Sequence, residues 1–176
     1  MEAPDEELML AYGRGDAGAF ETLYKRHRGA VYRFVLRAIK QRSAAEELFQ
    51  EVWIRVIEAR TRYAPQARFT TWVYTIAHNL LVDHWRKKGL VLASLDAEDV
   101  PIENANPARQ AEGREAVARL LQAIEALPAA QREAFLLHEE AGLTVAEIAA
   151  ATGCNEEAAK SRLRYAMAKL KAAVDE

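Results

Sequence analysis

Apolar residues recur every three or four positions along nearly the whole chain, and the one long exception lies between residues 90 and about 112. Such spacing predicts amphipathic helices, because it places the apolar side chains on one face, and the two-residue alternation of strands is absent. In the exceptional segment acidic residues, asparagines and prolines replace the pattern, which is typical of a flexible acidic linker. We therefore predict an all-α protein of two small helical domains, residues 1–89 and 113–176, joined by the linker 90–112.

Capping residues indicate where the helices of the first domain begin and end. Asp16 is a suitable N-cap for the first long helix, and Ser43 with Glu46 has the spacing of a capping box that opens the next one. Residues 60–68 are expected to form a loop. A further helix is expected to begin near residue 70 and to end in lysines followed by a glycine. The residues that this helix is expected to bury are Val73, Ile76, Ala77, Leu80 and His84.

The second domain contains the clearest local motif. Thr144 and Glu147 form another capping box, and the helix that they open ends at Gly153, a residue able to adopt a positive φ angle in a tight turn. A longer helix follows at once, with Asn155 as its N-cap. This is the arrangement of a helix-turn-helix, whose second helix enters the major groove of DNA.

The second helix of this motif separates apolar from polar residues. Its apolar face contains Ala159, Leu163, Ala166 and Leu170, and its other faces contain Lys160, Ser161, Arg164 and Lys171. Arginine and lysine in such places can reach guanine edges or phosphates. A helical hairpin with a solvated basic face is the alternative interpretation.

A second candidate surface lies in the first domain, where Trp72, Asn79, Asp83 and Arg86 fall on one side of a helix. An aromatic ring and a guanidinium offer stacking faces, and an amide can pair with a base edge, so this row suits a single nucleic-acid strand. The alternative is that Trp72 belongs to the core and that the other residues are ordinary surface polars.

Composition excludes several classes of protein. Cys154 is the only cysteine, which rules out an internal disulfide and a multi-thiolate zinc site. No stretch of about 18 apolar residues occurs and the N-terminus is acidic, so we expect a cytoplasmic protein without membrane insertion. No two histidines have the spacing of metal ligands on a helix, and the sequence contains no glycine-rich phosphate loop. We therefore expect no metal, no other cofactor and no enzymatic activity. A net charge of −2 is unfavourable for a protein that holds DNA by itself.

Five features in order resemble the extracytoplasmic-function, or group IV, sigma factors of the sigma-70 superfamily. They are an acidic start, the segments 45–54 (AEELFQEVWI) and 69–80 (FTTWVYTIAHNL), and, after a linker, the segment 124–135 (IEALPAAQREAF) and the helix-turn-helix ending at 160–163 (KSRL). The resemblance covers nearly the whole chain. It implies a dissociable initiation subunit of bacterial RNA polymerase, with region 2 in residues 1–89 and region 4 in residues 113–176.

The family's functional surfaces can be carried over to matching positions. The helix that docks on the clamp of core polymerase would contribute Leu48, Phe49, Gln50, Glu51 and Trp53, although Phe49 or Trp53 could instead belong to the core. The minus-ten surface, with a base pocket beside residues 63–68, would contain Arg60, Phe69, Trp72, Asn79, Asp83, Arg86, Lys87 and Lys88. The minus-thirty-five element would be read by Lys160, Ser161 and Arg164, with Arg162 and Thr144 on the DNA backbone.

The resemblance also implies partners beyond DNA. These are the clamp and flap regions of core RNA polymerase, duplex promoter DNA, the melted non-template strand, and an anti-sigma factor that covers the core-docking and recognition helices. The chain departs from the family at the start of the recognition helix, where Asn155, Glu157, Ala158 and Ala159 replace the usual Pro, Gly, Thr and Val. Tyr165 replaces an arginine. Two alternatives stay open: a stand-alone helix-turn-helix regulator, and a sigma-like decoy that binds only an anti-sigma factor.

Overall fold

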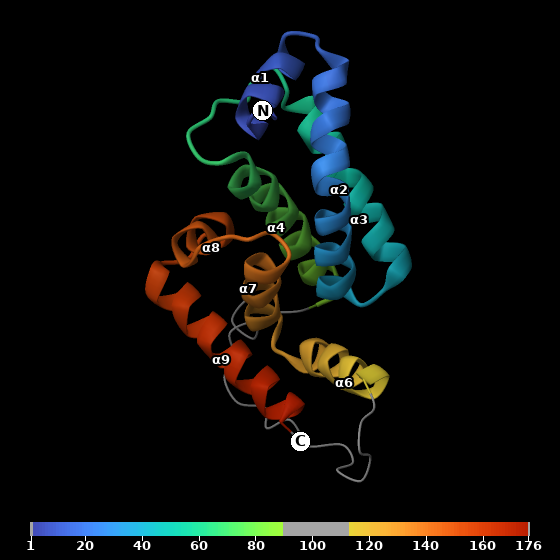
Figure 1. Ribbon diagram of the computed structural model, residues 1–176, viewed down its shortest axis with the longest axis vertical. Coiled ribbons are helices and arrows are strands. Elements are labelled where there is room, and N and C mark those ends of the chain that lie inside the picture. The colour runs from blue at the N-terminus through green and yellow to red at the C-terminus, as the bar shows by residue number, and fades with distance from the viewer. Residues whose placement is uncertain (1, 90–112, 176) are drawn as a thin grey trace.

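The computed structural model describes residues 2–89 and 113–175, and all regular secondary structure in these ranges is α-helical (Figure 1). The predicted all-α class is thereby confirmed, whereas the linker predicted for residues 90–112 lies outside the described residues. The first domain consists of α1 (Asp5–Gly13), α2 (Ala17–Ile39), α3 (Arg42–Glu58) and α4 (Phe69–Lys87). The second consists of α6 (Gly113–Ala126), α7 (Ala129–Glu139), α8 (Val145–Thr152) and α9 (Glu156–Val174). Within the described ranges, no helix is both long and apolar enough to cross a membrane.

Most helix ends lie where the capping residues predict them. Asp16 accepts a hydrogen bond from the backbone N–H of Ala19 at the start of α2, with a distance of 3.2 Å. Thr144 and Glu147 form the expected reciprocal capping box of α8. Gly153 ends this helix with φ 71°, in the left-handed region that favours glycine.

The capping box predicted at Ser43 is wrong. Helix α3 already begins at Arg42, and Gln41 occupies the N-cap position without a side-chain hydrogen bond. Ser43 therefore lies inside the first turn. Glu46 instead accepts a hydrogen bond from the guanidinium of Arg42 at 3.4 Å, as expected for side chains four residues apart on one helix face.

Helix α4 differs from the prediction in its buried face. The residues of α4 that are buried are Phe69, Thr71, Val73, Tyr74, Ala77, Leu81 and Trp85. Ile76, Leu80 and His84, which were expected in the core, are only half-buried. The face is turned because α4 packs against α2 and α3 and also against α8, so that the large rings of Tyr74 and Trp85 point into the core.

The two domains pack against one another. Helix α8 packs against α4, and α7 packs against α2. Figure 1 shows α8 to the left of α4, and α7 between α9 and α2. The buried residues of both domains form one continuous cluster, from Met9 in α1 to Leu170 in α9. The surfaces of α2 and α4 that face the second domain are consequently covered in this arrangement.

Candidate nucleic-acid and polymerase interfaces

The helix-turn-helix consists of α8, the turn at Gly153 and α9. The side chain of Asn155 accepts a hydrogen bond from the N–H of Ala158 at 2.8 Å and so caps α9, as its position predicts. Ala159 is fully buried. Its small side chain therefore fits where α9 approaches its neighbours, although valine is usual there in the family that the chain resembles.

The predicted minus-thirty-five residues occupy the first half of α9. Lys160 and Arg164 are exposed, and Ser161 and Arg162 are half-buried. The guanidinium of Arg164 lies 5.4 Å from the centre of the Tyr165 ring. Thr144 is exposed, but its hydroxyl oxygen already accepts a hydrogen bond from the N–H of Glu147 at 3.2 Å. Contacts of these residues with DNA stay predictions.

The predicted minus-ten residues divide into an exposed and a buried group. The exposed ones are Arg60, Asn79, Asp83, Arg86, Lys87 and Lys88. Trp72 is half-buried. Phe69 is 0% exposed, and its ring centre lies 5.2 Å from that of His27 and 5.8 Å from that of Trp72. Phe69 is therefore a core residue that no base can reach in this structure, contrary to its assignment from the resemblance.

A cavity of about 530 Å³ opens beside the loop between α3 and α4. Its lining comes from the loop, from α4 and from α8, and consists of Ala59, Arg62, Tyr63, Ala64, Gln66, Ala67, Thr71, Trp72, Thr75 and Ala150. The buried hydroxyl of Tyr63 has no hydrogen-bond partner among the described residues. Burial and the nearby Glu6 and Asp5 raise the pKa of Tyr63 to about 12, so that it keeps its proton. The rings of Trp72 and Tyr63 thus contribute to the wall of the pocket, while the neutral Tyr63 hydroxyl is itself buried.

Helix α1 holds this loop in place. Glu6 accepts a hydrogen bond from the backbone N–H of Phe69 at 2.9 Å and thereby satisfies one of the free N–H groups at the start of α4. Asp5 accepts a hydrogen bond from Arg26 at 3.0 Å and pairs with His27 at 2.9 Å. Burial opposes the ionisation of Asp5, but these partners lower its pKa. The sequence does not predict α1, because the apolar residues of this helix follow one another and do not share one face.

Helix α3 carries the predicted polymerase-binding residues. Leu48 and Trp53 are buried in the core, with 8% and 5% exposure, so they are not available to a partner in this structure. Phe49 is half-buried and Gln50 is exposed, while Glu51 accepts a hydrogen bond from Arg55 at 3.1 Å. Ile54, which the sequence pattern did not single out, is 45% exposed on this helix.

Comparisons with known proteins match two parts of the chain to two families. Residues 23–91 match the Sigma-70 region 2 family, and residues 118–170 match the Sigma-70, region 4 family. The chain is 34% identical over 166 residues to the RNA polymerase sigma factor CarQ of Myxococcus xanthus, covering 93% of either chain. This chain belongs to the extracytoplasmic-function sigma factors of the sigma-70 family. The sigma factor is also 31% identical over 169 residues to the ECF RNA polymerase sigma factor SigC of Mycobacterium tuberculosis, covering 93% of this chain and 90% of that one.

A solved structure shares the fold of the sigma factor. It is that of the sigma factor RpoE of Bartonella quintana in complex with the anti-sigma factor NepR, with a TM-score of 0.68, 22% identity, and coverage of 89% of this chain and 96% of that one. Family membership makes RNA polymerase and promoter DNA the partners of the sigma factor. In the described part of the chain, no group of three or more His, Cys, Asp or Glu side chains is placed to hold a metal ion.

Proposed function

We propose that this sigma factor docks on the clamp of core RNA polymerase through α3, reads the minus-thirty-five duplex with α9, and captures melted minus-ten bases beside the loop between α3 and α4. The observation that carries the proposal is the presence, in one chain of this family, of a helix-turn-helix and of an aromatic-walled pocket lined mostly by residues of the first domain. The protein itself then performs no catalysis and acts in the cytoplasm, where polymerase transcribes.

The exposed side of α3 is the proposed clamp contact. Gln50 and Ile54 are four residues apart and therefore share a face, and Phe49 and Glu51 flank it. An exposed isoleucine among polar side chains fits the apolar centre and polar rim of a helix-on-helix interface. Leu48 and Trp53, being buried, would support this helix from within. The flap region of polymerase is proposed to bind region 4.

The minus-ten contact is proposed to use the pocket together with the exposed side of α4. Trp72 would stack against an extruded base, and the Tyr63 ring, whose centre lies 4.9 Å from that of Trp72, would support it from behind. Asn79, Asp83 and Arg86 lie exposed further along α4 and would contact the neighbouring bases and the strand. The lysines at the end of α4 would contact phosphates.

An anti-sigma factor is proposed as the regulator. The structurally similar RpoE was solved with the anti-sigma factor NepR, which supports this without identifying a partner here. Such a partner would cover Ile54 on α3 and Tyr165 with Met167 on α9, because these apolar side chains are exposed. Protection of both helices from hydrogen exchange in the complex is expected. Absence of protection at either helix would contradict this part of the proposal.

Run-off transcription with core enzyme on a promoter library tests the function as a whole. The wild-type protein is expected to yield transcripts from a defined subset of promoters. Ile54→Glu is expected to lose holoenzyme assembly while its unfolding free energy changes by less than about 1 kcal/mol, because the side chain is exposed. Ile54→Leu is the matched control and should assemble normally. A specific duplex shift by the pure protein, unchanged by core enzyme and without any transcript, would instead favour a stand-alone regulator.

A further inference from the structure

Helix α1 contacts both ends of the loop between α3 and α4. At the end of the loop, Glu6 accepts a hydrogen bond from the backbone N–H of Phe69 at 2.9 Å. At its beginning, Gly13 lies so close to Arg60 that a Cβ on this glycine would be 2.5 Å from the Arg60 carbonyl oxygen. The guanidinium of Arg60 also lies 5.9 Å from the centre of the Tyr12 ring. One short helix therefore holds the loop at its beginning and at its end.

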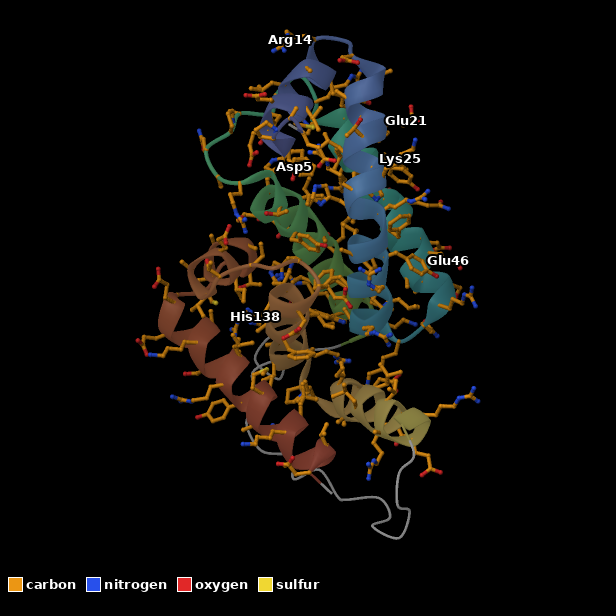
Figure 2. The ribbon with its side chains drawn as sticks, in the orientation of Figure 1. Asp5, Arg14, Glu21, Lys25, Glu46 and His138 are labelled. Carbon is orange, nitrogen blue, oxygen red and sulfur yellow. The ribbon has the colours of Figure 1, made fainter. Side chains whose placement is uncertain are left out.

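The same helix is fixed to α2 independently of the loop. Asp5 binds Arg26 and His27 of α2, at 3.0 and 2.9 Å. Met9, in the middle of α1, is 0% exposed. Figure 2 shows Asp5 at the end of α1 that is nearer to α4, and Arg14 at the other end. Because α1 is anchored on the rest of its domain, it can serve as a rigid support for the loop.

The loop has little packing of its own. Residues 64–68 are all exposed, and Tyr63 is the one residue of the loop with a buried side chain. Arg68 occupies the N-cap position of α4, but its side chain does not cap the helix and instead pairs with Glu147 of the second domain. The first N–H groups of α4 therefore need another acceptor. Glu6 is the carboxylate that fixes this end of the loop within the first domain.

The shape of this loop determines the shape of the pocket. Most of the residues that line the pocket belong to the loop, namely Ala59, Arg62, Tyr63, Ala64, Gln66 and Ala67. None of the lining residues comes from α1. A loop that is held in one shape offers a captured base a single set of contacts and loses less conformational entropy on binding. A change in α1 would consequently reach the base only through the loop.

We propose that Glu6 is a positioning residue for minus-ten recognition, and that α1 holds the loop in the shape that selects the captured base. Glu6 fixes the end of the loop, and Tyr12 with Gly13 fixes its beginning. This inference rests on the proposed function, because it concerns the same pocket. Helix α1 precedes residues 23–91, which match the region 2 family, so the support of the loop comes from outside that segment.

Three variants separate the hydrogen bond of Glu6 from its charge. Glu6→Ala removes both. Glu6→Gln removes the charge but keeps an oxygen that can accept a hydrogen bond from the N–H of Phe69. Glu7→Ala is the matched control, because it removes the neighbouring acid of α1, which is exposed. Circular dichroism checks that each variant is folded at the assay temperature.

The measured quantity is the base preference of the holoenzyme at the minus-ten element. Run-off transcription with wild type on the promoter library first identifies a preferred promoter and the minus-ten position at which substitution costs most. The preference is the ratio of the initial run-off rates from that promoter and from its substituted form. A variant that is merely less stable loses rate on both templates and keeps this ratio.

Glu6→Ala is expected to lower the preference about tenfold, because the loop loses a hydrogen bond to a charged acceptor and occupies the selective shape less often. Glu6→Gln and Glu7→Ala are expected to keep the preference within about twofold of wild type. Hydrogen exchange reports on the loop directly. The amide of Phe69 should exchange faster in Glu6→Ala than in the other two variants.

Either of two results would overturn the inference. One is a Glu6→Ala variant that keeps the wild-type preference, whatever its absolute rate, since Glu6 then only stabilises the fold. The other is a Glu6→Gln variant as defective as Glu6→Ala, since the charge and not the bond to the loop would then matter. If Glu6→Ala does not fold, Tyr12→Leu decides, because it removes the ring beside Arg60 and keeps an apolar side chain. It should lower the preference about threefold, and an unchanged preference would overturn the inference too.

The wild-type measurement separates this inference from the proposed function. If wild type has no base preference at any minus-ten position, the proposed function fails. If wild type discriminates between the templates and Glu6→Ala does so equally well, only the positioning role of Glu6 fails.

Discussion

Replacement of Phe69 by alanine distinguishes a core residue from a base-contacting one. The side chain is 0% exposed and packs against the rings of His27, Tyr63 and Trp72. Deleting a buried phenylalanine ring costs about 3–5 kcal/mol. A protein of this size loses about 2–4 °C of Tm per kcal/mol. We therefore expect Phe69→Ala to lower the Tm by about 10 °C, as measured by circular dichroism.

Trp72→Ala is the matched variant, since this ring is half-buried and lines the pocket. Its Tm should fall by less than that of Phe69→Ala, by about 3–6 °C. Promoter opening by the holoenzyme, assayed well below the Tm of both variants, should be reduced more by Trp72→Ala than by Phe69→Ala. Permanganate reactivity of thymines in the minus-ten element measures the opening. A Phe69→Ala variant that keeps the wild-type Tm and nevertheless abolishes promoter opening would show that Phe69 contacts DNA and is not a core residue.

Three further changes follow from single features of the fold. Gly13→Ala should destabilise the protein by about 1–3 kcal/mol in urea unfolding, because a Cβ there would lie 2.5 Å from the carbonyl oxygen of Arg60; an unchanged unfolding free energy would contradict this. Lys40→Gly should stabilise it by about 0.5–1 kcal/mol in the same assay, since Lys40 ends α2 with φ 70°, and destabilisation would show that its side chain matters more than its backbone. The pKa of Glu147 is lowered from 4.5 to about 2, so its ionisation stabilises the fold above pH 4.5 and ceases to do so as the pH falls towards 2. The Tm difference between wild type and Glu147→Gln should accordingly shrink over that range, and a constant difference would argue against an ionic role.

Local signals were sufficient for the fold class and the helix-turn-helix. Helical spacing and the caps at Asp16, Thr144 and Asn155 depend on residues close together in sequence, and the structure contains all three caps. The buried face of a helix was harder to predict where the helix packs against neighbours on two sides. On α4 the periodicity could not show that Phe69 is buried and Trp72 only partly so.

Local sequence patterns could not predict contacts between residues that lie far apart in the chain. Glu147 was identified as a capping residue, which it is, but its bond to Arg68 joins positions 79 residues apart. On α3 the resemblance selected Leu48 and Trp53 by position, and only packing reveals that Ile54 is the exposed apolar residue. Which side chains are buried, and which side chains they bond, depends on how the domains assemble. The sequence could therefore locate the candidate helices, but it could not show which of their residues are exposed.

The positions of the tryptophans make the intrinsic fluorescence of the protein a probe of its state. Of its three tryptophans, Trp53 and Trp85 are each 5% exposed in the core, whereas Trp72 is half-buried in the wall of the pocket that Ala150 completes. Acrylamide should therefore quench chiefly the emission of Trp72. Separation of the domains, or a base stacked in the pocket, would change this emission and leave that of the two core residues nearly constant. The state of the molecule could then be followed in solution without any label.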